Sequence, residues 1–225
     1  PTCQNYDITY NSRLPPMTPR EAACELTYYR RLYGVDRLAI SGGEPTLNRR
    51  WLIEFFKELK KLNKDEKAKL HLDTNASILT PDYIDELIEA GVTDIGPDLK
   101  ALRIETFMKI TGLNDRELAE KYLETSWNAV KYIIDNYYPE KVFLGIGIPY
   151  NKFFHPTLDE IYEIGYKIAS MDPSVQVCVL DYRPEFRRTN IRTPSVDEML
   201  EVKKALEDTG LKTVIVQTRI GHIGP

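Results

Sequence analysis

The feature that most constrains the fold is a regular alternation between short apolar runs and amphipathic helical patterns. Strand-like runs are expected at residues 35–41, 69–73, 94–99, 142–149, 175–182 and 212–217. A helical pattern precedes each run, at residues 18–34, 49–62, 80–91, 115–137, 158–171 and 195–210. Such alternation implies parallel strands joined by right-handed helical crossovers. The sequence therefore predicts an α/β fold, either a doubly wound open sheet or a complete or partial barrel.

The composition predicts one globular domain with a slight acidic excess. The 225 residues are 42% hydrophobic, and a net charge of -4 argues against a nucleic-acid-binding protein. No apolar run approaches the roughly 18 residues of a transmembrane helix, and no export leader opens the chain. The cysteines form no disulfide framework and favour a reducing compartment: Cys3, Cys24 and Cys178. We expect a single cytoplasmic domain over residues 1–225 that binds neither nucleic acid nor membrane.

The loops at the carboxyl ends of parallel strands are where ligands bind in both candidate architectures. The run at 35–41 is followed by the tetrapeptide Gly42-Gly43-Glu44-Pro45. Two glycines allow a backbone to approach a ligand closely, and the neighbouring carboxylate can hold an ammonium group. An ordinary turn between a strand and a helix would also explain a bare pair of glycines.

Polar residues also end the next two predicted strands. A period of two places His71, Asp73 and Asn75 on one face, where an inward aspartate is costly unless it is paired or bound to a ligand. Asp98 and Lys100 share a face of the following strand. Asn75 alone could be a turn residue, and Asp98 and Lys100 could form a structural salt bridge. Two adjacent strands with inward polar ends favour a ligand site.

Three further features concern glycines, cysteines and arginines. Gly145 and Gly147 share a strand face, which indicates either close approach of a ligand or tight packing in a narrow barrel. Cys24 and Cys178 fall within a helix and a strand and are interpreted as buried, inert thiols. The loop after the run at 175–182 carries arginines that either bind an anionic substrate or an acidic partner, or are simply solvated: Arg183, Arg187, Arg188 and Arg192.

In their order along the chain, these motifs resemble the radical S-adenosylmethionine (SAM) superfamily. Gly42-Gly43-Glu44-Pro45, Asp73-Thr74-Asn75 and Asp98-Leu99-Lys100-Ala101 are most similar to its branch of pyruvate formate-lyase activating enzymes. The opening Cys3-Gln4-Asn5-Tyr6-Asp7-Ile8 resembles the end of that family's C-x-x-x-C-x-x-C-x-N cluster loop. The segment Tyr182-Arg183-Pro184-Glu185-Phe186 looks like the related AmmeMemoRadiSam enzymes, although these often carry His at the position of Arg183.

The resemblance implies a partial (β/α)6 barrel that holds a [4Fe–4S] cluster on three cysteines and SAM on the fourth iron. An electron from a ferredoxin- or flavodoxin-type donor would cleave SAM to methionine and a 5′-deoxyadenosyl radical. That radical would take hydrogen from a substrate, which could be a protein glycine, as in glycyl-radical activases, or another protein or a small molecule. The alternative is a barrel without a cluster that acts as a binding or scaffold subunit.

The resemblance also implies roles for individual residues. Cys3 would be the third cluster cysteine and Asn5 would contact SAM, while the motif Gly42-Gly43-Glu44-Pro45 would receive its amino group. The remaining motif residues, with Lys100 also counted as catalytic, would bind the ribose, the carboxylate or a monovalent cation near it: Asp73, Thr74, Asn75, Asp98 and Lys100. Two more cluster cysteines and the first strand would precede Pro1, so residues 1–225 would be an amino-terminally incomplete core domain.

Overall fold

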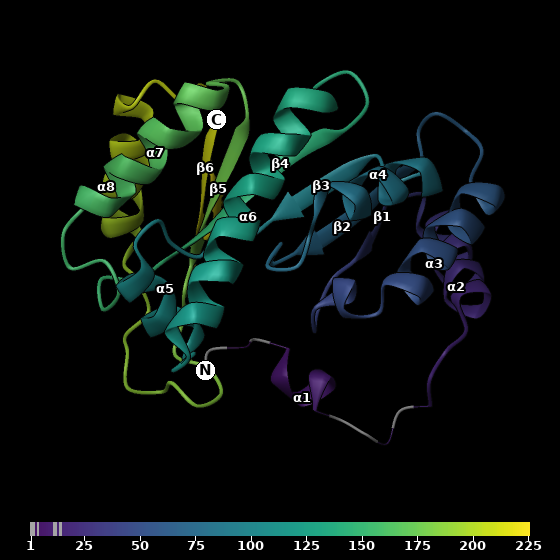
Figure 1. The fold of residues 1–225 in the computed structure, drawn as a ribbon, viewed down its shortest axis with the longest axis horizontal. Coiled ribbons are helices and arrows are strands. Elements are labelled where there is room, and N and C mark those ends of the chain that lie inside the picture. The colour runs from purple at the N-terminus through teal and green to yellow at the C-terminus, as the bar shows by residue number, and fades with distance from the viewer. Residues whose placement is uncertain (1–2, 4, 11–12, 14) are drawn as a thin grey trace.

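The computed structural model describes residue 3, residues 5–10, residue 13 and residues 15–225. A curved seven-stranded sheet runs through the molecule, with helices ranged along it (Figure 1). The strands are β1 (Arg37–Ile40), β2 (Lys69–Thr74), β3 (Asp94–Pro97), β4 (Phe143–Tyr150), β5 (Gln176–Asp181), β6 (Val214–Thr218) and β7 (Gly221–Ile223).

The order of the strands in the sheet is the same as their order in the sequence. Each neighbouring pair from β1 to β6 is parallel, and β7 returns antiparallel to β6. A doubly wound sheet reverses its strand order at a switch point, and this sheet does not. The predicted α/β partial barrel is therefore confirmed, and the doubly wound alternative is wrong.

The helices follow the predicted pattern, with additions. They are α1 (Tyr6–Thr9), α2 (Pro19–Tyr33), α3 (Arg49–Leu62), α4 (Pro81–Ala90), α5 (Ile104–Thr111), α6 (Arg116–Asn136), α7 (Asp159–Met171) and α8 (Val196–Asp208), with the 3-10 turn η1 (Pro45–Leu47). No helix in the described part of the chain is both long and apolar enough to cross a bilayer.

Helix α2 shows why the local sequence predicts helix ends well. The Thr18 hydroxyl accepts the Glu21 amide at 3.3 Å, and the Glu21 carboxylate accepts the Thr18 amide at 2.8 Å, which forms the capping box. The helix ends at Gly34, whose φ of 63° lies in the left-handed region that glycine adopts without strain. All of these interactions lie within a few residues of one another.

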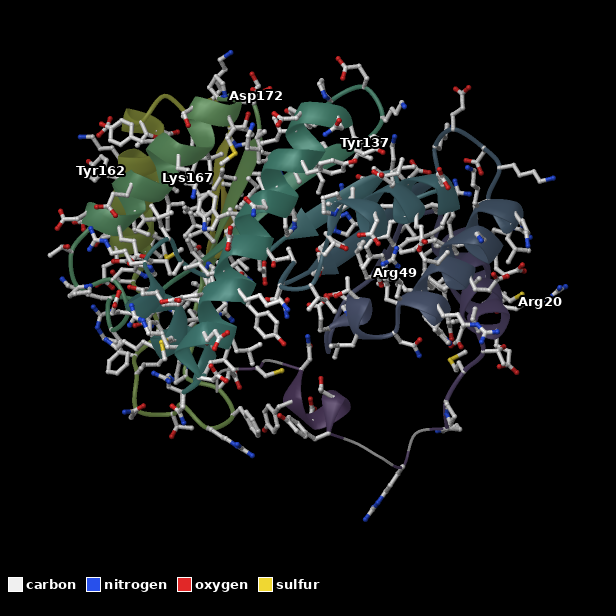
Figure 2. The ribbon with its side chains drawn as sticks, in the orientation of Figure 1. Arg20, Arg49, Tyr137, Tyr162, Lys167 and Asp172 are labelled. Carbon is white, nitrogen blue, oxygen red and sulfur yellow. The ribbon has the colours of Figure 1, made fainter. Side chains whose placement is uncertain are left out.

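The helices are held to each other by polar as well as apolar contacts. At the start of α3, Arg49 pairs with Asp82 at 2.7 Å and with Glu86 at 2.9 Å, both on α4 (Figure 2). Tyr137 closes α6 and donates a hydrogen bond to Asp85 of α4 at 2.7 Å. These contacts attach α4 to both neighbouring helices and fix the strands between them.

Strand alternation separates an apolar outer face from a polar inner one. In β2, Leu70 and Leu72 are buried within the same hydrophobic cluster as Phe55 and Phe56 of α3. On the opposite face of β2, His71 is buried and Asp73 stays partly exposed. The inward polar set inferred for β2 is thus directed away from the helices, as a ligand site requires.

Helix α5 was not predicted from the sequence. Arg103 occupies its N-cap position and provides no side-chain cap. Instead, the buried carboxylate of Glu160 on α7 accepts the Leu102 and Arg103 amides at 3.0 and 2.8 Å, and the Thr106 hydroxyl at 2.6 Å. Because Glu160 fixes the start of α5 from a distant helix and Arg103 provides no cap, no local signal marks where α5 begins.

Candidate functional site

A cavity of about 530 Å³ lies at the carboxyl ends of the strands. Its volume falls within the range of about 300–1,000 Å³ that is usual for small-molecule sites. Every residue that the sequence analysis assigned to the site lines it except Pro45: Cys3, Asn5, Gly42, Gly43, Glu44, Asp73, Thr74, Asn75, Asp98 and Lys100. Pro45 instead begins η1 directly after Glu44.

The Glu44 carboxylate ties the glycine loop to the end of β2. Its Oε1 accepts the Thr74 hydroxyl at 2.6 Å and the hydroxyl and amide of Thr46 at 2.6 and 3.2 Å. Its Oε2 accepts the Asn75 amide at 2.7 Å. Glu44 therefore acts first as a clamp that fixes the loop, and the sequence analysis missed this use because it considered only an ammonium partner.

The glycine loop has a backbone that other residues would adopt only with strain. Gly42 and Gly43 have φ of 71° and 54°. A Cβ on Gly42 would lie 3.3 Å from the Asn5 amide nitrogen, so Asn5 packs directly against the loop. Among the described residues, the carbonyl oxygens of Gly42 and Gly43 accept no hydrogen bond. With respect to the described residues, the loop thus offers two carbonyl acceptors beside the cavity.

Asp73 is oriented by its own strand and by the next one. His71 Nε2 lies 2.7 Å from Asp73 Oδ1, as expected of two residues on one strand face. A Cβ on Gly96 of β3 would come within 2.6 Å of the same oxygen, so glycine makes room for this carboxylate. His71 is 8% exposed and is a positioning residue that the sequence analysis placed on this face without assigning it a role.

Asp98 and Lys100 form an ion pair of 2.8 Å, and both line the cavity. The pair is therefore a salt bridge within the site, and the two interpretations of the sequence are compatible. A Cβ on Gly147 of β4 would lie 2.3 Å from Asp98 Oδ1. A side chain on Gly147 would therefore displace the Asp98 carboxylate, just as one on Gly96 would displace Asp73.

The end of β5 adds residues that the sequence analysis did not assign to the site. Asp181 is buried, its Oδ2 accepts Arg183 Nε at 3.0 Å, and its Oδ1 has no partner among the described residues. Burial raises the pKa of Tyr182, which also lines the cavity, to about 12. The rule that ligands bind at the carboxyl ends of strands, applied to β5, would have found both Asp181 and Tyr182.

The cysteines differ in their surroundings. Cys24 is exposed on α2, so its interpretation as buried is wrong. Cys178 is partly buried on β5, and burial, aided by the nearby Asp98 carboxylate, raises the pKa of its thiol. Of the described cysteines, Cys3 alone lines the cavity. No group of three metal-ligating side chains occurs in the part of the chain that the structure describes.

The residues present fit a ligand that carries both an ammonium and a carboxylate group, as SAM does. The unpaired loop carbonyls and the orphaned Asp181 Oδ1 are acceptors, and Lys100 supplies a positive charge. Iron–sulfur clusters need several thiolates, and Cys3 offers one at the mouth of the same cavity. The donor set thus fits SAM, together with one ligand of a cluster.

Comparisons with known proteins agree with this geometry. The family model of the radical SAM superfamily matches residues 1–161. A probable GTP 3′,8-cyclase of Methanococcus aeolicus is 36% identical over 113 residues, which are 50% of this chain and 36% of that protein. A GTP 3′,8-cyclase of Saccharophagus degradans is 30% identical over 127 residues, 56% of this chain and 37% of that protein. The chain therefore matches about a third of the length of these curated relatives.

Solved structures show the same fold at low sequence identity. A domain of pyruvate-formate lyase-activating enzyme from Bacteroides vulgatus superposes with a TM-score of 0.61 at 17% identity, over 80% of this chain and 98% of that one. Streptococcus suis SuiB, bound to S-adenosylmethionine, gives a TM-score of 0.69 at 15% identity, over 92% of this chain and 45% of that one.

Proposed function

The chain belongs to the radical SAM superfamily, a family of enzymes, and we propose that it cleaves SAM reductively to methionine and a 5′-deoxyadenosyl radical that takes hydrogen from a substrate. When bound, a [4Fe–4S] cluster supplies the electron, which a ferredoxin- or flavodoxin-type donor would deliver. The observation that carries the proposal is that polar residues at the carboxyl ends of β1, β2, β3 and β5 line one cavity together with Cys3.

In this proposal Cys3 is a cluster ligand, and the glycine loop receives the amino group of SAM. The free carbonyls of Gly42 and Gly43 accept the ammonium protons, while Asn5 packs against the loop. Glu44 contributes mainly by holding the loop against Thr74 and Asn75 through charge-assisted hydrogen bonds. A preformed loop avoids the cost of ordering it on binding.

Lys100 holds the SAM carboxylate, and Asp98 orients the Lys100 ammonium from 2.8 Å away. Asp73, held by His71, accepts the ribose hydroxyls. We include a monovalent cation near the SAM carboxylate, because Asp73 Oδ2 and Asp98 Oδ1 accept no hydrogen bond in the described part of the chain. Carboxylate oxygens are the ligands that hard cations prefer.

The cleavage assay tests this function directly. Full-length protein reconstituted with iron and sulfide, and reduced at low potential, should convert SAM to 5′-deoxyadenosine slowly even without substrate. Cys3→Ala should abolish both the cleavage and the cluster absorbance, whereas Cys24→Ala, on the exposed face of α2, should retain both. Cleavage that survives in Cys3→Ala would contradict the proposal and favour the scaffold alternative.

Lys100→Ala tests the SAM site apart from the cluster. The cluster absorbance should remain, while loss of one charge-assisted contact weakens SAM binding by about 10- to 150-fold. Equilibrium dialysis with labelled SAM measures this change. If Lys100 only braces the barrel, the variant should lose thermal stability, and the folded fraction should bind SAM normally.

A further inference from the structure

Two cations from different parts of the chain lie over the same pair of aromatic rings. Lys109 of α5 places its Nζ 4.3 Å from the ring centre of Phe153 and 5.9 Å from that of Phe154. Arg188, in the loop after β5, places its Cζ 5.7 and 5.0 Å from the same two centres. Both positive charges thus lie within 5.9 Å of the same two ring centres. Figure 1 shows that α5 and this loop lie at the same end of the molecule.

Neither cation has a carboxylate partner within the described residues. Three arginines nearby are paired: Arg183 with Asp181, Arg192 with Glu198 and Arg103 with Glu163. Arg187, which precedes Arg188 in the chain, lies over the Phe186 ring at 4.9 Å. Lys109 Nζ donates to the neutral carbonyl of Phe153, and the backbone amide of Arg188 donates to the carbonyl of Glu185. In the loop after β5, Arg183 and Arg192 are therefore neutralised, whereas Arg188 has no carboxylate partner among the described residues.

This arrangement has a cost that a bound anion would remove. Two like charges in neighbouring positions repel each other, more strongly near the protein surface than in bulk water. Stacking on a phenyl ring uses the face of a guanidinium group and leaves its N–H edges free. Those edges match the two oxygens of a carboxylate or a phosphate, and an ammonium group adds a point charge beside them.

Lys109 and Arg188 lie next to the SAM cavity, with the Phe154 ring between them and its wall. The Phe154 ring lies 5.4 Å from the Tyr182 ring, and Phe154 also clusters with Ile110. Both Tyr182 and Ile110 line the SAM cavity. The positive charge of Arg188 counteracts part of the rise that burial causes in the pKa of Tyr182, which agrees with its position close to that wall.

We propose that Lys109 and Arg188 bind an oxyanion, a phosphate or a carboxylate, carried by the substrate and held at the edge of the SAM cavity. This inference rests on the proposed function and names the chemical class of its substrate. Phe153, which is 42% exposed, offers an apolar face to the part of the substrate next to the anion. An anion fixed there would present the rest of the substrate toward the cavity.

The experiment measures binding of two probes to the full-length protein by calorimetry: inorganic pyrophosphate and a tetraglutamate peptide. The double variant Lys109→Gln/Arg188→Gln should lose at least about 10-fold in affinity for the probe that binds the wild type more tightly. The conservative variant Arg188→Lys should keep part of the affinity that the double variant loses. Arg192→Gln, in the same loop but paired with Glu198, is the matched control and should bind normally. Tighter binding of pyrophosphate indicates a phosphorylated substrate, and tighter binding of the peptide indicates an acidic protein.

The outcomes separate this inference from the proposed function. The double variant should cleave SAM without substrate at the wild-type rate and melt at nearly the wild-type temperature, since neither residue lines the SAM cavity itself. If neither probe binds the wild type more tightly than it binds the double variant, the oxyanion site is wrong, whatever the cleavage assay gives. If the wild type does not cleave SAM, the proposed function fails while the binding result still decides the oxyanion site. If the double variant is unstable, Arg188→Gln alone gives the same comparison.

Discussion

Gly147→Ala should weaken SAM binding although Gly147 does not itself line the SAM cavity. The new methyl carbon would lie 2.3 Å from Asp98 Oδ1, far inside contact distance. Asp98 must therefore turn away, and its 2.8 Å ion pair with Lys100 loses its geometry. If one charge-assisted contact to SAM depends on this pair, binding falls by about 1.5–3 kcal/mol, or about 10- to 150-fold.

Gly145→Ala is the matched control, because Gly145 lies two residues earlier in β4. Its Cβ would meet Phe143 Cε1 at 3.3 Å, and this ring is 38% exposed and can move. Both variants gain a similar small benefit from reduced freedom of the unfolded chain, about 0.4–1 kcal/mol. A difference between them in SAM affinity therefore reports on Asp98 and not on the loss of a glycine.

Calorimetric titration with SAM, and a thermal melt of each variant, give the result. Wild-type affinity in Gly147→Ala would refute the placement of Asp98 and Lys100 at the ligand, provided that the variant is folded. A large drop in melting temperature with normal affinity would show instead that the pair braces the barrel. An equal loss of affinity in Gly145→Ala would show that the lumen as a whole tolerates no added methyl group.

Two further outcomes follow from shifted pKa values. The Arg192 guanidinium and the helix cap at Ser195 lower the pKa of Glu198 to about 2. This carboxylate therefore contributes stability that is complete above its ordinary pKa and is lost as the pH falls toward 2. The free energy of unfolding should depend less steeply on pH in this acid range in Glu198→Gln than in the wild type, and an unchanged slope would contradict the assignment. The raised pKa of the Cys178 thiol keeps it protonated. Iodoacetamide at pH 8 should therefore modify the exposed Cys24 well before Cys178, and mass spectrometry can follow both reactions. Equal rates would show that strand β5 opens readily.

Much of the barrel could be predicted because its signals are local. The period of two in β2, the capping box at Thr18 and Glu21, and the left-handed Gly34 each depend on residues within about one helical turn. Strand ends followed by polar residues located the cavity for the same reason. Parallel strands bring their carboxyl ends to one edge, so residues distant in sequence meet there.

Elements that depend on distant partners could not be predicted. Helix α5 begins just after Leu102 and Arg103, whose amides Glu160 of α7 accepts, and no residue near Arg103 signals that contact. The clamp role of Glu44 depends on Thr74 and Asn75, which belong to the next strand. The missed start of α5 and the missed clamp role of Glu44 have the same origin. The role of a carboxylate depends on which hydrogen-bond donors the fold brings within its reach.

The sequence by itself determined the alternation of parallel strands with helices and many of the polar residues that line the cavity, and the family resemblance favoured the partial barrel over the open sheet. Only the tertiary structure decided how those polar groups share partners: which arginines are neutralised, which carboxylates lie over Gly96 and Gly147, and that Lys109 and Arg188 lie over the same two phenylalanine rings. The physical reason is the separation along the chain over which each interaction acts. Backbone propensity and side-chain period act over a few residues, whereas charge pairing and close packing act between whichever residues the folded chain brings together.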